Sequence, residues 1–434
     1  MPPPFPRRLA ITQSQADQLR RLMSAILPEN PFYSRKFDAA GVSRRISTLH
    51  QFTLDVPFTT KQELVEDQLA TPPYGTDLTY PLDHYTRCHQ TSGTQGVPLR
   101  WLDTVESWDW VVRNWEQVHR TAGVTAADRV FFAFSFGPFL GFWGAFEAAA
   151  RLGSLCLPGG GFSSTARLRA ILDHGATVLC CTPTYALRLV EVAVEEKISL
   201  EASPVKLIIT AGEPGGCIPA TRARLAHLWP GARVYDHHGM TEVGAVTYEC
   251  PVRPGVLHVM ENAYFAEVID PATGKAVEPG QTGELVLTTL GRLGSPVLRY
   301  RTGDLVKTAA DDYCECGRHE LALEGGIMGR ADDMVVVRGV KVYPSAVEEI
   351  IRATGGVAEY QVHVSQAQAL TELSLTIEPA PECADVNALV HQVERAFDSA
   401  LILRVPVKAV APGALPRFEM KAKRWVKQDL TAAR

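Results

Sequence analysis

The sequence lacks the long apolar runs and basic tracts that mark several protein classes. No stretch approaches the roughly 18 uninterrupted apolar residues of a membrane helix, and the proline-rich start has no signal-peptide core. The 434 residues carry 43 Lys and Arg against 48 Asp and Glu, a net charge of −5, with no long basic run. We therefore expect neither a nucleic-acid partner nor a membrane surface.

A redox motif of two cysteines is also missing. The nine cysteines are scattered, and no two form a Cys-x-x-Cys redox motif. This usage is typical of a reducing compartment, so we expect a cytoplasmic protein. With 46% hydrophobic and 21% charged residues over 434 positions, the chain is long enough for two or three domains with sizeable cores.

A loop rich in hydroxyls and glycine, Thr91-Ser92-Gly93-Thr94-Gln95-Gly96, is the first feature that indicates chemistry. Glycine lets the backbone approach a phosphate closely, and successive N–H groups form an anion-binding concavity. A P-loop has two glycines five apart followed by Lys and Ser/Thr, whereas Gly93 and Gly96 are three apart and no such lysine follows. Taken alone, the loop fits a surface turn equally well, so later motifs must decide.

Local patterns predict the helices before and after this loop. Leu19, Leu22, Met23 and Ile26 fall at helical spacing and predict an amphipathic helix that ends before Pro28. Thr60-x-x-Glu63 predicts a capping box at the start of another helix. Asp103 is expected to cap a third. The buried face of that third helix is expected to carry Trp108, Val111, Trp115 and Val118.

From about residue 129, short apolar runs alternate with helical segments, a pattern typical of parallel strands covered on both faces. The expected strands are residues 130–134, 155–157, 177–180, 206–210 and 234–235. Ligands bind at the carboxyl ends of such strands. We therefore expect the Thr91 loop, the Gly212-Glu213-Pro214 turn and the segment after Tyr235 to converge on one cleft.

Two further units follow. Alternating runs at residues 266–269 and 284–288 predict a small antiparallel β region. Beyond Asp332, the expected elements are strands 334–337, 340–342, 361–364 and 373–377 and helices 344–351 and 386–401. The predicted fold is α/β: a large N-terminal domain, residues 1–331, with mostly parallel sheet plus the small β region, and a small C-terminal α+β domain, residues 332–434.

Four motifs accompany the glycine-rich loop. They are Tyr235-Asp236-His237-His238-Gly239-Met240-Thr241-Glu242, Tyr300-Arg301-Thr302-Gly303-Asp304, Gly329-Arg330-Ala331-Asp332 with Arg338-Gly339, and Pro416-Arg417-Phe418-Glu419-Met420-Lys421. In this order and spacing the five motifs resemble those of acyl- and aryl-adenylate-forming ligases, and most closely the phenylacetate-CoA ligase branch. The resemblance covers essentially the whole chain. Alone, Glu242 would fit a helix start, Asp304 a turn and Lys421 a solvated surface; their joint occurrence favours a site.

The resemblance implies ATP, Mg²⁺ and CoA as cofactors and a catalytic set of Lys421, Glu242 and Thr94. Lys421 would reach the substrate carboxylate and the α-phosphate, Glu242 would ligate Mg²⁺, and Asp304 would bind the ribose hydroxyls. The remaining nucleotide contacts are expected at Thr91, Ser92, Gly93, Thr94, Gly212, Glu213, Pro214, Asp236, His238, Gly239, Thr241 and Arg330.

The resemblance also implies a two-step cycle with a mobile C-terminal domain. That domain would close with Lys421 inward for adenylation, then turn about a hinge at Asp332. The second arrangement would present Gly339, whose lack of a side chain lets the pantetheine arm of CoA pass.

The expected reaction is ATP-dependent activation of an aromatic carboxylate and its transfer to CoA, with release of AMP and pyrophosphate. The acyl pocket is expected at Phe132, Phe136, Phe142, Ala211, Gly212 and His237, with Phe139 and Trp143 as further candidates. His237 predicts a hydroxy- or aminobenzoate, unless it bonds a backbone carbonyl instead. Loading of a carrier protein or an amine is the alternative, and a silent nucleotide-binding scaffold is disfavoured by the intact Glu242, Asp304 and Lys421. Whether the protein forms a homodimer is left open.

Cysteine and histidine also gather in two short clusters. Cys314-x-Cys316-Gly317-Arg318-His319 lies about sixty residues after Cys250, and His258 follows Cys250 by eight. Thiolates and imidazole in this arrangement predict a structural, tetrahedral Zn²⁺ site of Cys250, His258, Cys314 and Cys316. The fourth ligand is open between His258 and His319, and buried cysteines that act as small hydrophobes are the alternative.

Overall fold

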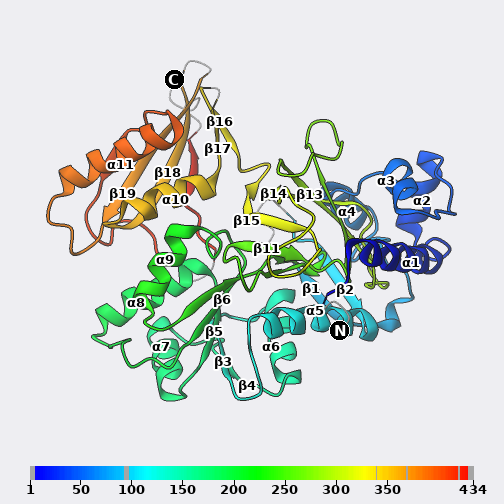
Figure 1. The fold of residues 1–434 in the computed structure, drawn as a ribbon, viewed down its shortest axis with the longest axis horizontal. Helices are drawn as coiled ribbons and strands as arrows, with labels where there is room; N and C mark the ends of the chain where they lie inside the picture. The colour runs from blue at the N-terminus through cyan, green and yellow to red at the C-terminus, as the bar shows by residue number, and fades with distance from the viewer. Residues whose placement is uncertain (1–4, 92–96, 339, 368–369, 419–420, 429–434) are drawn as a thin grey trace.

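The computed structural model describes residues 5–91, 97–338, 340–367, 370–418 and 421–428 (Figure 1). Its first part is helical: α1 (Arg8–Ile26), α2 (Pro31–Ala40), α3 (Leu49–Asp55), α4 (Lys61–Ala70) and the single turn η1 (Leu82–His84). The helix predicted to end before Pro28 is α1, which ends at Ile26. The capping box is confirmed, because the Thr60 hydroxyl accepts from the Glu63 N–H and the Glu63 carboxylate accepts from the Thr60 N–H.

A hairpin and a long helix follow. Strands β1 (Tyr85–Gln90) and β2 (Arg100–Thr104) pair antiparallel, and α5 (Val105–Thr121) begins directly after β2. The expectation that Asp103 caps this helix is wrong. Thr104 is the N-cap, and its hydroxyl accepts from the Ser107 N–H. Asp103 instead lies on the inward side of β2, completely buried, where it pairs with Arg292.

The centre of the molecule is the predicted parallel sheet, with strand order β4-β3-β5-β6-β7. Its strands are β3 (Arg129–Phe132), β4 (Leu155–Pro158), β5 (Val178–Cys181), β6 (Leu207–Thr210) and β7 (Arg233–Asp236), and its helices are α6 (Leu140–Arg151), α7 (Ser164–Asp173), α8 (Pro183–Glu195) and α9 (Pro219–Leu228). Alternate residues face opposite sides: Phe132 packs in the core with α5 and α6, and Phe131 in the core with α7, α8 and α9. Both faces are therefore covered, as continuous apolar strands require.

The antiparallel β region has six strands, more than the two runs that the pattern predicted. The order is β10-β11-β15-β14-β13-β12, with β10 (Thr247–Glu249), β11 (Val256–Val259), β12 (Tyr264–Ile269), β13 (Thr282–Thr289), β14 (Tyr300–Thr308) and β15 (Ala322–Arg330). A two-residue hairpin, β8 (Gly239–Met240) with β9 (Gly244–Ala245), joins it to the parallel sheet. This sheet brings Asp304 and Arg330 opposite each other on neighbouring strands.

The C-terminal part is a separate α+β unit with its own core (Figure 1). It contains β16 (Val335–Val337), β17 (Val340–Val342), α10 (Pro344–Thr354), β18 (Val357–Ala367), β19 (Leu370–Pro379), α11 (Val386–Leu401), β20 (Val407–Ala409) and β21 (Trp425–Gln428). Helix α10 lies against α9 of the preceding part (Figure 1). Among the described residues, no helix is both long and apolar enough to cross a membrane.

Candidate active site

Lys421 lies among the charged side chains that the motifs singled out. Surrounding protein atoms lower the pKa of Lys421. The negative charges of Glu213, Asp304 and Glu242 raise this pKa, and the positive charge of Arg330 lowers it further. The side chain is nevertheless exposed to solvent, so we treat the ammonium as charged at neutral pH. Segments from the parallel sheet, the antiparallel sheet and the C-terminal part therefore meet at one lysine.

Glu242 is a buried carboxylate with two donors. Its side chain is 3% exposed, and Oε1 accepts from the Tyr300 hydroxyl at 3.1 Å and from the Lys61 ammonium at 3.1 Å. A carboxylate held this firmly is a suitable ligand for a hard cation such as Mg²⁺.

Lys61 is a site residue that the sequence reasoning missed. It is the first residue of α4, and the capping box at Thr60 fixes the direction in which that helix starts. The sequence shows this box but gives no sign that Lys61 reaches Glu242 across the fold. Residues 91–98 of the glycine-rich loop include no Lys or Arg, so Lys61 brings a cation that the loop does not carry itself.

Asp304 connects two of the predicted nucleotide residues. Its Oδ2 lies 3.2 Å from His238 Nε2, an ion pair or hydrogen bond when that nitrogen carries the proton. Its Oδ1 lies 3.5 Å from Arg330 Nη1, which also donates to the Thr302 carbonyl at 3.2 Å. A Cβ at Gly303 would lie 2.7 Å from Arg330 Nη2, so only glycine lets the guanidinium approach.

Only the base of the glycine-rich loop is described. The Thr91 N–H donates to the Leu99 carbonyl at 3.0 Å, and the Leu99 N–H donates to the Thr91 hydroxyl at 3.0 Å. These two bonds hold the ends of the loop together. The predicted phosphate contacts at Ser92, Gly93 and Thr94 lie outside the described residues, as does Gly339.

The end of β7 and the residues that follow it are bonded largely within the protein. Asp236 accepts from the Thr210 hydroxyl at 3.1 Å and from the His237 N–H at 3.0 Å, and burial raises its pKa to about 6. Gly239 begins the β8–β9 hairpin. The nucleotide contacts predicted for Asp236 and Gly239 remain predictions.

A buried ion pair holds the backbone next to Glu242. Arg292 donates to both oxygens of Asp103 at 2.7 and 2.6 Å, and both side chains are 0% exposed. A third guanidinium nitrogen donates to the Thr241 carbonyl at 2.8 Å. Arg292 therefore links the end of β2 to the residue that precedes Glu242.

Glu213 binds the backbone of two separate segments. Its Oε1 accepts from the Thr184 N–H at 2.9 Å, and its Oε2 accepts from the Ala422 N–H at 2.8 Å. The preceding Gly212 has φ +94°, and a Cβ there would lie 3.7 Å from Lys421 Cε. This turn therefore touches the lysine and the segment that carries it.

His237 is buried against aromatic rings. Its ring centroid lies 4.3 Å from that of Trp115 in a perpendicular arrangement, and Gly144 makes room for Trp115, because a Cβ there would lie 2.6 Å from the indole. Burial, with His119 and His238 nearby, lowers the pKa of His237 to about 3. Neither ring nitrogen makes a hydrogen bond of good geometry among the described residues. The backbone of His238 lies close enough to oppose the lowering of the His237 pKa, so the choice between a backbone carbonyl and a substrate group stays a prediction.

The aromatic residues predicted for the acyl pocket form one cluster with a graded exposure. Phe132 is completely buried, whereas Phe136, Phe139 and Phe142 are half-buried. Trp143 is 41% exposed, and its indole donates to the Gly137 carbonyl at 2.9 Å. Phe132 thus belongs to the core under the cluster, and the half-buried phenylalanines lie at its edge. Flanking the Gly212 turn, Ala211 is half-buried and Pro214 exposed.

Sequence profiles and relatives define the family. The profile of AMP-binding enzymes matches residues 81–291, and that of their C-terminal domain matches residues 339–428. Phenylacetate-coenzyme A ligase of Escherichia coli (strain K12) is 31% identical over 95% of this chain and 94% of its own length. The chain belongs to this family of AMP-binding enzymes. It is an AMP-forming acid–CoA ligase, which makes an acyl-adenylate and then a CoA thioester.

Solved structures match the ligase in two conformations. A 2-hydroxyisobutyryl-CoA ligase in the postadenylation state is 28% identical and superposes with a TM-score of 0.91, covering 97% of this chain and 90% of that one. The same ligase in the thioesterification state with CoA is 29% identical and superposes with a TM-score of 0.73, covering 98% of this chain and 91% of that one. The arrangement described here is thus closer to the postadenylation state.

The cysteine and histidine clusters meet in the antiparallel sheet. Ligand atoms of Cys250, His258, Cys314 and Cys316 all lie within 4.8 Å of one another. The sulfurs of Cys250 and Cys314 are 3.7 Å apart, close to the ~3.8 Å that two thiolates have on one tetrahedral Zn²⁺ ion. His319 is half-buried, and its Nδ1 lies 3.2 Å from the Asp312 carbonyl oxygen. His258 is therefore the histidine in the group.

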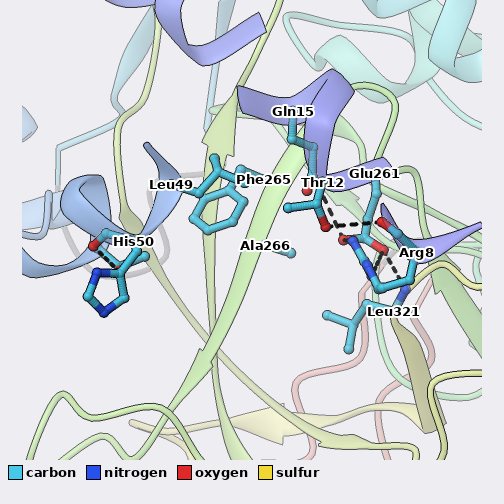
Figure 2. A pocket seen from close by; sticks show the side chains of 10 residues that line it. Arg8, Thr12, Gln15, Leu49, His50, Glu261, Phe265, Ala266 and Leu321 are labelled. Carbon is cyan, nitrogen blue, oxygen red and sulfur yellow. Dashed lines mark hydrogen bonds and ion pairs between the residues drawn. The ribbon is translucent and has the colours of Figure 1, made fainter. Parts of the chain in front are cut away.

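A separate cavity of about 390 Å³ lies between α1, α3 and β12. Figure 2 shows Arg8 directed at Glu261, with which it forms two bonds of 2.7 Å. Gln15 donates to Glu261 at 3.3 Å and to the Tyr264 carbonyl at 2.8 Å. The charges of Arg8 and Glu261 neutralise each other. None of the residues predicted for the active site lines this cavity.

Proposed function

We propose that the ligase activates an aromatic carboxylate with ATP and transfers the acyl group to CoA, releasing AMP and pyrophosphate. The observation that supports this most is the meeting of Lys421 with Glu242 and Asp304. Attack of a carboxylate on the α-phosphate brings two anions together, so positive charge must offset their repulsion. Lys421 would supply that charge as a compact cation on a flexible stem.

The other predicted residues take roles around this centre. Thr91, Ser92, Gly93 and Thr94 would hold the phosphates, assisted by Lys61. Glu242 would bind Mg²⁺, which when present neutralises phosphate charge. Asp304 would accept from the ribose hydroxyls, with His238 and Arg330 beside it. The remaining nucleotide contacts are proposed at Gly212, Pro214, Asp236, Gly239 and Thr241.

A change of domain arrangement would separate the two half-reactions. We place the boundary at 331/332, with residues 332–434 turning about Asp332. That residue lies in an exposed turn and accepts from Arg330 Nε at 3.0 Å. The different TM-scores for the two states of the related ligase support such a change. Gly339 would then lie beside the pantetheine arm.

Zn²⁺ bound by Cys250, His258, Cys314 and Cys316 is the second part of the proposal. The three sulfurs and one imidazole suit Zn²⁺, and four protein ligands leave no open position for catalysis. The ion would fasten β11 to the loop between β14 and β15 and so stabilise the antiparallel sheet.

His237 would set the substrate class. A buried imidazole without a partner loses hydrogen-bonding free energy unless a ligand supplies one. A hydroxyl or amino group on a benzoate would do so, which makes a hydroxy- or aminobenzoate the proposed acid.

The deciding experiment is pyrophosphate release, with and without CoA, over a panel of acids. The panel contains hydroxybenzoates, aminobenzoates, benzoate, phenylacetate and 2-hydroxyisobutyrate. We expect kcat/KM for the best polar benzoate to exceed that for benzoate roughly 5- to 150-fold, and His237→Ile to reduce that ratio. A preference for unsubstituted or aliphatic acids, or an unchanged ratio in His237→Ile, would overturn the assignment.

The acceptor and setting complete the proposal. Turnover that needs an added carrier protein or amine rather than CoA would favour the alternative acceptor. The nine free thiols suit a reducing cytoplasm, and light scattering of the purified ligase would show whether it is a homodimer.

A further inference from the structure

Glu213 occupies an unusual position for a residue that the sequence assigned to the nucleotide. Its two carboxylate oxygens accept from backbone N–H groups of different parts of the molecule: Thr184 at 2.9 Å and Ala422 at 2.8 Å. Thr184 is the second residue of α8, where helical N–H groups have no partner within the helix. The start of α8 thus fixes one oxygen of the Glu213 carboxylate.

The other oxygen holds the residue next to Lys421. A bond to the Ala422 N–H restrains the backbone from which the lysine side chain extends, and the charge of Glu213 attracts the ammonium in company with Asp304 and Glu242. The four single bonds of a lysine side chain leave its ammonium poorly positioned unless the backbone is fixed. Glu213 does this through the N–H of the residue that follows the lysine.

Neighbouring contacts show that the same helix receives the rest of the segment. Arg424 lies 3.5 Å from the Thr184 hydroxyl, and Arg417 pairs with Glu191 of α8 at 2.9 Å. These contacts join the C-terminal unit to the parallel sheet in an arrangement close to the postadenylation state. A C-terminal unit that turns away would break them together.

We propose that Glu213 is a positioning residue for the adenylation half-reaction: it docks the Ala422 backbone onto the start of α8 and so directs Lys421 into the site. The bond forms when the C-terminal unit closes and is absent once that unit turns to the thioester-forming arrangement. This role rests on the proposed function of Lys421 and replaces the nucleotide contact predicted for Glu213.

The test compares Glu213→Ala and Glu213→Gln in the two half-reactions. Adenylation is followed as acid-dependent ATP–pyrophosphate exchange, and thioester formation as CoA consumption from supplied acyl-adenylate. Glu213→Ala should lower kcat of exchange roughly 10- to 100-fold, with KM for ATP and thioester formation each within about twofold of wild type. Glu213→Gln keeps an acceptor oxygen and should recover most of that loss.

Glu195→Ala is the matched control. Glu195 is the last residue of α8, is exposed and pairs with Arg188 at 2.8 Å, away from Lys421. Its replacement should therefore change neither half-reaction. Equal loss in both half-reactions, or a raised KM for ATP with unchanged kcat, would assign Glu213 to the nucleotide and overturn the proposal. Wild-type activity in Glu213→Ala would also overturn it.

A second measurement does not depend on the substrate. Hydrogen exchange of the Ala422 amide should be at least about tenfold faster in Glu213→Ala than in wild type, because the bond that protects it is lost. Unchanged exchange would refute the docking role. If the wild type adenylates none of the acids, the proposed function fails, whereas this exchange result still decides the role of Glu213.

Discussion

Removal of the buried carboxylate of Asp103 should destabilise the ligase strongly. Asp103→Ala leaves the Arg292 guanidinium charged and completely buried without its partner. Loss of one member of a buried pair costs about 3–5 kcal/mol. With an unfolding entropy of about 2.1 cal/mol/K per residue over roughly 330 residues, 1 kcal/mol corresponds to about 1.4 °C. The thermal midpoint should therefore fall by about 4–7 °C.

The double variant Asp103→Ala/Arg292→Met separates charge from packing. The double variant removes both buried charges, so its thermal midpoint should recover most of the decrease seen in Asp103→Ala. It also removes the donor to the Thr241 carbonyl, so adenylation should stay impaired while stability recovers. Differential scanning calorimetry and pyrophosphate release measure the two effects. Equal destabilisation in the single and double variants would refute the reasoning from an unpaired charge.

Three further changes test other parts of the structure. Lys421→Ala should lower adenylation at least about 100-fold yet leave thioester formation from supplied acyl-adenylate within a few-fold, because only the first step needs charge at the α-phosphate; equal loss in both assays would contradict this. Metal analysis should find about one Zn²⁺ per chain, and Cys314→Ser/Cys316→Ser should lower both zinc content and thermal midpoint; zinc loss at unchanged stability would contradict a structural role. Burial lowers the pKa of His119 from 6.5 to about 4, so the folded state binds fewer protons than the unfolded state between these values. Stability is then complete above pH 6.5 and falls by about 2 kcal/mol at pH 5; His119→Gln should reduce the difference in thermal midpoint between pH 7 and pH 5, and an unchanged difference would exclude His119.

Elements defined by neighbouring residues could be predicted from the sequence. The capping box at Thr60, the five parallel strands and the helix Val386–Leu401 follow from periodicity and local hydrogen bonding, which act over a few residues. The short edge strands β20 and β21 were missed, because few residues carry a pattern there and their partners lie far away.

Site features that depend on distant contacts could not be predicted in this way. Asp103 reads locally as a helix cap, yet its partner Arg292 is 189 positions away. Lys61 reaches Glu242 only because the fold brings α4 beside the β8–β9 hairpin. Motif order indicated which residues matter, whereas the partners of each side chain required the structure. The role of Glu213 changed for this reason.

The paired ends of the glycine-rich loop have a consequence for engineering. Thr91 and Leu99 close its base with one backbone bond and one bond to a hydroxyl, and neither depends on the residues between them. These bonds fix the two ends of the loop, so they offset the entropy cost of bringing its ends together whatever residues lie between. Seven-residue loops from other AMP-binding enzymes should be transplantable between these two positions without disturbing the sheets on either side.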